Sequence, residues 1–445
     1  MVLLDEEIYI LPYENALDKK LIYAPVRGWV ELIEKNTADR IICSSIDSQE
    51  DLKENPNFNS LIKELQKMPL KDLDVMQKGL PMLNIDLSTG CNMRCIYCYA
   101  GRGEGDYKYQ QKEHIDMILD AYFHHLYTSP CYKEGTDCSI AFTNDAEPTF
   151  APDLLRYTVM TAIEKAKVFK IKPIFILPTN GAFHDDLRTF IIQYFHTVSI
   201  SFEGLPWVQN LHRPLANGEP SFQRVFENSK ALFQSGKKVC FSGVVTRHNL
   251  YHLKDTIDFF HEHFPGSMVS FGQVNLIGRA SAEQMELAVE QQSFDEQLLC
   301  AIQYAESTSI KVQVKHGSTH LNPRRHYCSS TAKPNWSMSL NGDMYACMEE
   351  KSESMKIGWF DFNQKQLYFN DEKIRSLGEK NVDCNSRCKE CFAKYLCAGG
   401  CISKGDSQAA LCEGIRQRCL HFINKAYEDK RLKKEAQRLF KILEE

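Results

Sequence analysis

Apolar residues between positions 80 and 320 follow two alternating patterns. The stretch 111–127 carries apolar side chains at i, i+3, i+4, i+7, i+8 and i+11, which predicts an amphipathic helix. Short apolar runs predict strands at 82–87, 138–143, 173–178, 198–203, 238–246 and 268–275. Strands that alternate with helices indicate parallel βα units, so we expect an α/β fold with its chemistry at the carboxyl ends of the strands.

Both ends of the chain show other patterns. Apolar runs at 8–11, 21–23 and 28–33 predict three strands, and helices are expected near 37–44 and 58–68. Residues 1–80 should therefore form a small N-terminal α+β domain. The segment 425–445 reads as a charged helix docked on the core by a leucine seam.

Composition and charge narrow the function classes. A chain of 445 residues exceeds the usual size of one domain. The net charge is -5 and the basic residues are dispersed, so no nucleic-acid partner is expected. The first residues lack a basic segment, and no apolar run reaches the ~18 residues that a membrane span needs. We expect a cytoplasmic protein without a membrane partner. In a reducing compartment, its 17 cysteines favour metal ligation over disulfides.

Three of these cysteines, Cys91, Cys95 and Cys98, have the spacing CxxxCxxC directly after the predicted strand 82–87. Three thiolates can hold three irons of a cubane cluster, which leaves the fourth iron open to chelate a small molecule. A closed site with four cysteines has no such vacancy. The spacing therefore predicts an open-site iron–sulfur cluster.

Residues 89–100 resemble the cluster loop of the radical SAM superfamily. This resemblance implies an open (β/α)6 partial barrel and a [4Fe-4S] cluster that binds S-adenosyl-L-methionine (SAM). It also implies that Tyr97, the residue before the third cysteine, lies beside the adenine of SAM.

Later strand ends add further resemblances. Asp145, Ala146 and Glu147 replace the Gly-Gly-Glu of the family's motif, which implies contact with the methionyl amino group of SAM. Two non-glycine residues restrict the backbone of this loop. Asn180 lies in a family-like Thr-Asn-Gly turn, and residues 278–280 also resemble the family at the end of the sixth strand.

The fourth strand ends in a segment that resembles the family's Ser-Leu-Asp-Gly turn. The resemblance implies that Ser201 contacts the carboxylate or the ribose of SAM. Glu203 stands where the family usually has Asp. Downstream, Arg213 is expected to pair in bidentate fashion with the SAM carboxylate.

A second array of cysteines, CxxCxxxxxCxxxC, lies in the last third of the chain. It resembles the SPASM extension of radical SAM proteins, which holds two auxiliary iron–sulfur clusters. The resemblance assigns Cys328, Cys347 and Cys401 to the first auxiliary cluster, with Cys384 or an open iron at its fourth position. It assigns Cys388, Cys391, Cys397 and Cys412 to the second, with Cys419 as the alternative to Cys412.

These expectations divide the chain into an N-terminal domain (1–80), a radical SAM barrel (81–320), a SPASM domain (321–424) and a terminal helix (425–445). The combination resembles peptide maturases, in which a 5′-deoxyadenosyl radical starts an oxidative C–C, C–O or C–S crosslink in a ribosomally made precursor peptide. The expected partners are that precursor with its leader, held on a winged-helix N-terminal domain by strand addition, and a flavodoxin or ferredoxin as electron donor. No catalytic base is assigned.

Alternatives remain open at this point. Residues 1–80 could be a plain cap on the barrel. An anaerobic sulfatase-maturing enzyme, which oxidises Ser or Cys to formylglycine, would carry the same clusters, but its CxxxCxxC begins nearer the N-terminus. A zinc-binding module without catalytic activity would explain the CxxC pair but not the barrel motifs.

Overall fold

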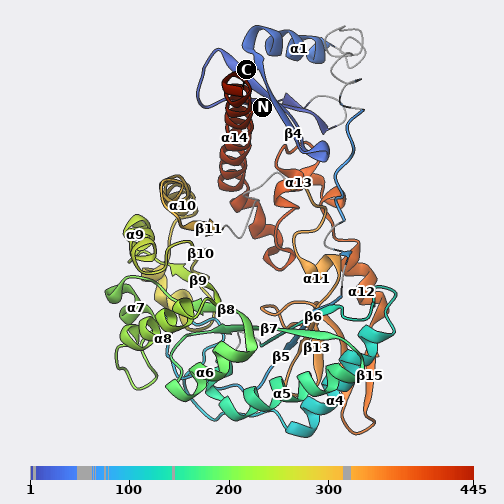
Figure 1. Ribbon diagram of the computed structural model, residues 1–445, viewed down its shortest axis with the longest axis vertical. Helices are drawn as coiled ribbons and strands as arrows, with labels where there is room; N and C mark the ends of the chain where they lie inside the picture. The colour runs from blue at the N-terminus through green and yellow to red at the C-terminus, as the bar shows by residue number, and fades with distance from the viewer. Residues whose placement is uncertain are drawn as a thin grey trace. The chain divides into compact units, whose positions relative to one another are not determined.

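The computed structural model describes residues 2–3, 7–47, 63, 65, 67–74, 77–78, 80–142, 146–313 and 322–444. The chain packs as two compact units, coloured by residue number in Figure 1. The first unit combines residues 1–77 with 316–332 and 379–445, and the second combines 78–315 with 333–378. The functional domain boundaries expected at 80, 320 and 424 stay predictions.

The second unit is built on six strands that pair in parallel and in chain order. They are β5 (Leu83–Ile85), β6 (Asp137–Phe142), β7 (Lys172–Thr179), β8 (Phe195–Ser201), β9 (Lys238–Val245) and β10 (Met268–Gln273). The predicted run of six parallel βα units is therefore confirmed. Its carboxyl ends lie along one edge of the sheet, where the predicted motifs follow.

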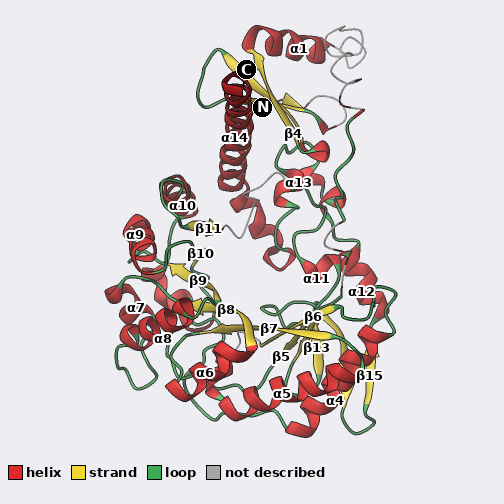
Figure 2. Ribbon diagram, viewed as in Figure 1, coloured by secondary structure: helices red, strands yellow, loops and turns green. Residues whose placement is uncertain are grey.

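Helices connect these strands. They are α4 (Lys112–Tyr127), α5 (Pro152–Val168), α6 (Asp185–Tyr194), α7 (Pro206–His212), α8 (Phe222–Gln234), α9 (Leu253–His263) and α10 (Gln291–Ala305). The predicted apolar stripe of α4 is buried along its whole length, from Ile115 to Leu126. Figure 2 shows α4 and α5 along the same side of the strands.

The sheet continues with further strands beside the two outer strands of this set, β10 and β5. β11 (Lys311–Gln313) pairs in parallel with β10, and β12 (Trp336–Met338) pairs in parallel with β5. The antiparallel strands β13 (Asp343–Tyr345), β14 (Lys356–Asp361) and β15 (Gln366–Phe369) follow, and then α12 (Asp371–Gly378). β11 and β15 are the outer strands of the described sheet, so the sheet is open. No strand is expected at 336–369 from the sequence.

The first unit contains a second, antiparallel sheet of β1 (Val2–Leu3), β2 (Tyr9–Pro12), β3 (Lys19–Ala24) and β4 (Trp29–Glu34), followed by α1 (Lys35–Asp47). The three predicted strands and the first predicted helix are present, and β1 is additional. The helix expected at 58–68 falls largely outside the described residues.

The cysteine-rich part of the first unit forms short helices and one long one. They are α11 (Ser329–Ala332), α13 (Lys394–Cys397) and α14 (Cys412–Glu444), with 3-10 turns at Val382–Cys384, Ser386–Cys388 and Ile402–Leu411. The helix expected at 425–445 is thus the second half of α14. Among the described residues, none of the helices is both long and apolar enough to span a membrane.

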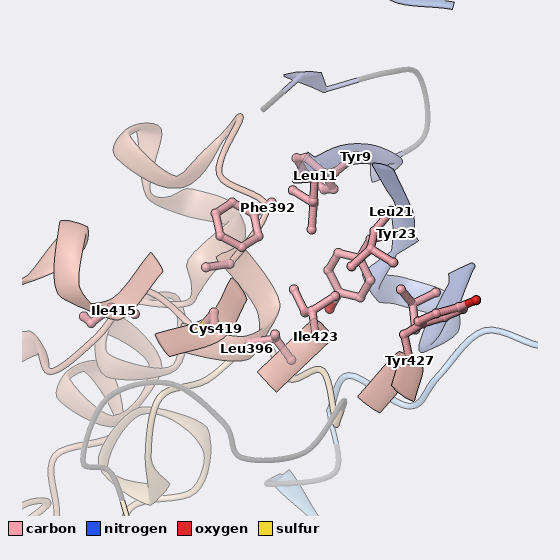
Figure 3. Packing of buried hydrophobic residues seen from close by; sticks show 12 residues of the cluster. Tyr9, Leu11, Leu21, Tyr23, Phe392, Leu396, Ile415, Cys419, Ile423 and Tyr427 are labelled. Carbon is pink, nitrogen blue, oxygen red and sulfur yellow. The ribbon is translucent and has the colours of Figure 1, made fainter. Parts of the chain in front are cut away.

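Both faces of the four-stranded sheet are buried. Alternate residues of each strand point to opposite faces, so the apolar residues divide between two clusters. On one face, Ile8, Ile10 and Ile22 pack with Ala38 and Ile41 of α1. The other face contributes Tyr9, Leu11, Leu21, Tyr23 and Val30 to a core with residues of the cysteine-rich segment: Phe392, Leu396, Ile415, Cys419, Ile423 and Tyr427 (Figure 3). The N-terminal sheet and this segment therefore share one hydrophobic core.

An ion pair joins the same two segments. The Nζ atom of Lys394, a side chain that is largely buried, lies 2.8 Å from Glu7 and 2.9 Å from Asp383. Lys394 therefore joins one acid from each of the two segments.

Replacing Leu21 with Ala tests the shared core. Leu21 is completely buried in it, so the change should cost about 2–5 kcal/mol of unfolding free energy. It should also increase the rate at which the buried Cys419 thiol is alkylated in metal-free protein. Leu17→Ala is the matched control, because Leu17 precedes the same strand but is 92% exposed. Equal alkylation rates in both variants would contradict a shared core.

Candidate functional site

The cysteine loop begins directly after β5 and has little secondary structure of its own. It is held along the segment that follows α7, because Arg94 N donates to the Pro214 carbonyl and Ile96 N to the His212 carbonyl, each at 2.9 Å. Gly90, just before the loop, packs against Phe150, where a Cβ atom would lie 2.1 Å from the ring. Residues that follow β6 and β8 therefore help to fix the loop.

The segment after β10 holds the other end of the loop. The Arg279 guanidinium donates to the carbonyls of Cys95 and Arg102, each at 2.7 Å, and its backbone N–H donates to the Cys98 carbonyl at 2.9 Å. The neighbouring Gly278 has φ +61°, and a Cβ atom there would lie 2.3 Å from the Tyr99 carbonyl oxygen. Glycine is required by both its backbone conformation and this close approach.

Each of the three sulfur atoms faces an N–H donor. Met93 N lies 3.4 Å from the Cys91 sulfur, Arg102 N lies 3.4 Å from the Cys98 sulfur, and the Arg213 Nη1 atom lies 3.9 Å from the Cys95 sulfur. Asn180 Nδ2 is a second donor to Cys91, at 3.7 Å. Donors of this kind stabilise thiolates, so the three side chains fit the ligand set of a cluster.

The described residues hold no group of three His, Cys, Asp or Glu side chains arranged around a single metal ion. A cubane cluster makes a different demand, since each of its cysteines binds a different iron. Its thiols need not converge on one point.

Glu147 lies at the carboxyl end of β6 and is buried. Its Oε1 accepts from Thr149 N at 3.0 Å, Thr149 Oγ1 at 2.6 Å and Thr179 Oγ1 at 2.7 Å, while Oε2 accepts from Asn180 N at 2.6 Å. Burial raises the pKa of this carboxyl, against the opposing effect of these hydrogen bonds. Glu147 thus links the ends of β6 and β7, and Oε2 keeps room for a further donor.

Other residues expected to contact SAM lie on the same edge. The Asn180 amide donates to Asn92 Oδ1 at 2.7 Å as well as to Cys91, so Asn180 supports the cysteine loop. Ser201 is half-buried at the last position of β8, and Ala146 is half-buried just before Glu147. Asp145 lies outside the described residues.

Glu203, just after β8, is the centre of a buried polar network. Its Oε1 accepts from Arg213 Nε at 2.8 Å and from the Tyr97 hydroxyl, and its Oε2 accepts from Val244 N at 3.0 Å. Gly243 of β9 makes room for this side chain, because a Cβ atom there would lie 3.0 Å from Oε2. The longer acid that replaces the family's Asp is therefore accommodated by a glycine on the neighbouring strand.

The charges of this network are strongly coupled. Burial by itself would raise the pKa of the Glu203 carboxyl, but the adjacent Arg213 guanidinium outweighs it and lowers this pKa to about 2. The guanidinium also lies 5.2 Å from the centroid of the Tyr97 ring. Arg213, expected to bind the SAM carboxylate, thus has three partners within the protein.

The cysteines assigned to the second auxiliary cluster lie together in the first unit. Electrostatic interactions connect the Cys397 thiol with Cys388, Cys391, Cys412 and Cys419, and burial raises its pKa. Cys388 interacts with Cys391 and Cys412. Arg416, one turn after Cys412 on α14, donates to Cys391 and interacts with Cys412. Cys419 instead packs in the hydrophobic core, where it interacts with Tyr23.

The set assigned to the first auxiliary cluster stays a prediction. Cys328 and Cys401 both lie near Tyr327 in the first unit, and Cys384 is exposed at the end of a 3-10 turn. Cys347 belongs to the second unit, where its sulfur accepts from Glu350 N at 3.4 Å.

Two features of this site are not predicted from the sequence. The guanidinium of Arg279 is the first, although its family-like context marks the segment 278–280. The second is Gly243, which reads as an ordinary residue of a buried strand until its neighbour across the sheet is known. Both residues contact segments that are distant in the sequence, so their roles cannot be read from their neighbours in the chain. A glycine within a strand can indicate a close approach of another group, but it does not identify that group.

Residues 85–260 match the family model of the Radical SAM superfamily. This part of the chain is therefore a radical SAM domain, as its cysteine loop predicts.

Curated relatives are Cysteine-type anaerobic sulfatase-maturating enzymes. The chain is 20% identical to that of Clostridium novyi (strain NT) over 76% of this chain and 94% of the relative, and 22% identical to that of Clostridium perfringens (strain ATCC 13124) over 74% and 90%.

Solved structures show the same fold. Native anSMEcpe with bound AdoMet matches with a TM-score of 0.59 at 17% identity, over 81% of this chain and 100% of that chain. Streptococcus suis SuiB bound to S-adenosylmethionine matches with a TM-score of 0.50 at 14% identity, over 92% and 98%.

Replacing Gly278 with Ala tests the support of the cysteine loop. The new Cβ atom would collide with the Tyr99 and Cys98 carbonyl oxygens, so the loop must move and iron bound by the first cluster should be lost. Gly101→Ala is the matched control. Gly101 has the same φ of +61° but no atom within 4 Å of its Cβ position, so this change costs only about 1 kcal/mol of backbone strain. Equal iron contents, measured after anaerobic reconstitution, would contradict the role of Gly278.

Proposed function

We propose that the protein is a radical SAM maturase that installs an oxidative intramolecular crosslink, C–C, C–O or C–S, in a ribosomally made precursor peptide. The observation that carries the radical SAM part is the loop of three cysteines, each with an N–H donor to its sulfur, at the carboxyl ends of parallel strands. When bound, the cluster and SAM together supply a 5′-deoxyadenosyl radical that abstracts hydrogen from the substrate.

The residues of the chain bind and orient SAM. Tyr97 is nearly buried among Val274, Ala280 and Leu287, an apolar setting that suits a position next to the adenine. Ser201 offers a hydroxyl at the strand end, and Glu147 Oε2 keeps acceptor capacity for the methionyl ammonium group. The backbone of Asp145 and Ala146 is proposed to complete this part of the site.

Two auxiliary [4Fe-4S] clusters are proposed as electron acceptors when the crosslink closes. For the second, we propose Cys388, Cys391, Cys397 and Cys412. Cys412 fits better than Cys419 because it interacts with both Cys388 and Cys397 and lies near Arg416. Cys419 also interacts with Cys397, but it is enclosed by apolar side chains. For the first, we propose Cys328, Cys347 and Cys401, with Cys384 as the candidate fourth ligand.

A leader peptide could add to the outer edge of β4. Both faces of the four-stranded sheet are covered, so its edges are the surfaces that keep backbone groups for a further strand. The Val30 carbonyl of β4 already accepts from Lys430 Nζ at 3.3 Å, so an added strand would compete with this contact. A flavodoxin or ferredoxin is the proposed electron donor, and the cytoplasm is the proposed compartment.

Sulfatase maturation is the second candidate, since the two curated relatives described above are named for it. Identity and TM-score are higher for the sulfatase-maturating enzymes and favour this second candidate, whereas the share of the chain that is covered supports the crosslinking proposal. The anSMEcpe fold covers 81% of this chain and is itself covered completely, so about a fifth of the chain lies beyond it. The SuiB fold covers 92%. The additional segments leave room for a recognition element that sulfatase maturation does not require.

Single alanine variants of Cys412 and Cys419 test the second auxiliary cluster. With three four-iron clusters the protein should hold about 12 iron. Cys412→Ala should lower this number or change the EPR signal of one cluster, because one iron loses its ligand. Cys419→Ala should keep both and lose only packing energy. The opposite result would make Cys419 the ligand.

Co-expression with a short precursor peptide encoded beside the gene tests the reaction. A crosslink removes two hydrogens and suppresses fragment ions between the linked residues in tandem mass spectrometry. The product should also fail to react with a hydrazide, since it contains no aldehyde.

Formylglycine gives a different outcome in this experiment. Oxidation of Ser also removes two hydrogens, but the product reacts with the hydrazide and fragments normally. The crosslinking proposal would be rejected if a sulfatase peptide gave this product while the precursor peptide stayed unchanged. That pair of results would favour sulfatase maturation.

A further inference from the structure

Arg213 is positioned between an acid and a cysteine of the loop. Only 8% of its surface is exposed, and Glu203 is 2% exposed, so both charges are nearly excluded from water. The Nε atom of Arg213 lies 2.8 Å from Glu203 Oε1, and its Nη1 atom lies 3.9 Å from the Cys95 sulfur. The planar guanidinium can make both contacts at once because its donors diverge in a fixed fork.

The acid fixes the direction of this fork. Glu203 is itself held by the Val244 backbone N–H and by the Tyr97 hydroxyl, so it has little freedom to follow another partner. Tyr97 lies two residues after Cys95 and packs near the guanidinium. Each contact therefore directs Arg213 toward the cysteine loop.

The charges around the three cysteines are unequal. Cys91 lies near the Glu147 carboxyl, whereas Cys95 lies near two guanidinium groups, those of Arg213 and Arg279, and near the one carboxylate of Glu203. Arg279 is directed at the Cys95 carbonyl oxygen, and Arg213 is directed at the sulfur. The Cys95 corner of the site is thus the positively charged one.

We propose that Arg213 is a positioning residue, held by Glu203, that donates to the Cys95 thiolate and raises the reduction potential of the first cluster instead of binding the SAM carboxylate. This inference rests on the proposed radical SAM function. The reduced cluster carries one more negative charge than the oxidised one, and the electron comes from the flavodoxin-type or ferredoxin-type donor. A nearby cation and N–H donor therefore stabilise the reduced form.

Redox titration followed by EPR, together with a SAM binding assay, tests this role in the reconstituted full-length protein. Arg213→Lys and Arg213→Gln should each lower the midpoint potential of the first cluster. The lysine ammonium keeps the charge but cannot contact Glu203 and Cys95 together. SAM affinity should change less than about threefold in either variant.

Arg94→Gln is the matched control. Arg94 lies on the same loop and pairs with Glu104 at 2.6 Å, but about half of its side chain is exposed. This variant removes the same charge without removing a donor to sulfur, so its potential should match that of the wild type.

Arg213→Gln leaves Glu203 buried without its cation and could lower the yield of folded protein. The double variant Glu203→Gln/Arg213→Gln removes both charges and keeps hydrogen-bonding groups in both places. It should fold, and its potential should fall less than that of Arg213→Gln, because the lost Glu203 anion and the lost Arg213 cation shift the potential in opposite directions.

Two results would overturn the inference. One is an unchanged potential in both Arg213→Lys and Arg213→Gln. The other is a loss of SAM affinity of tenfold or more with an unchanged potential, which would make Arg213 a ligand of SAM. If the wild type cleaves SAM, either result overturns only the role of Arg213 and leaves the proposed function intact. If neither the wild type nor Arg94→Gln cleaves SAM, the proposed function itself is rejected.

Discussion

The structure depends on one constraint: a loop with almost no secondary structure must hold three thiols in fixed positions. Only some of its backbone groups pair with one another, as Cys98 N does with the Cys95 carbonyl, and others are paired with segments that follow distant strands. The His212 carbonyl accepts from Ile96, and Arg279 donates to the Cys95 carbonyl. Because these partners follow β8 and β10, the loop takes its conformation only when the intervening parallel strands are in register. The barrel is in this sense the scaffold of the loop.

Much of the fold follows from local patterns. The six barrel strands and the stripe of α4 are predictable because each buries a periodic set of apolar residues. β12 to β15 are not, since they are short and three of them form an antiparallel extension that no βα alternation announces. The N-terminal strands are predictable as strands, but their packing is not. Apolar residues on both faces of these strands indicate that each face packs against another segment. They do not indicate that one of these segments is 392–427.

The candidate site divides in the same way. The candidate cysteine ligands can be proposed from the sequence because a short loop keeps neighbouring residues close together, and their spacing is visible in the sequence. The roles of Glu203 and Arg213 depend on atoms that approach across strands. The family resemblance predicts that Arg213 binds SAM, whereas in the structure Arg213 contacts Glu203 and the Cys95 sulfur. Gly243 explains why a longer acid fits there, and only the register between β8 and β9 reveals it.

The shared core also determines how recognition by the N-terminal sheet can be studied. Deleting residues 1–77 would expose Leu396, Ile423 and the other apolar residues that the sheet covers, and it would leave Lys394 without Glu7. Loss of peptide modification after such a deletion would then report damage around Cys388, Cys391 and Cys397 as well as loss of a binding surface. Changes confined to the outer edge of β4 avoid this ambiguity, because they leave both buried faces intact. Recognition and support of the cysteine-rich segment are thus separable only at the edge of the sheet.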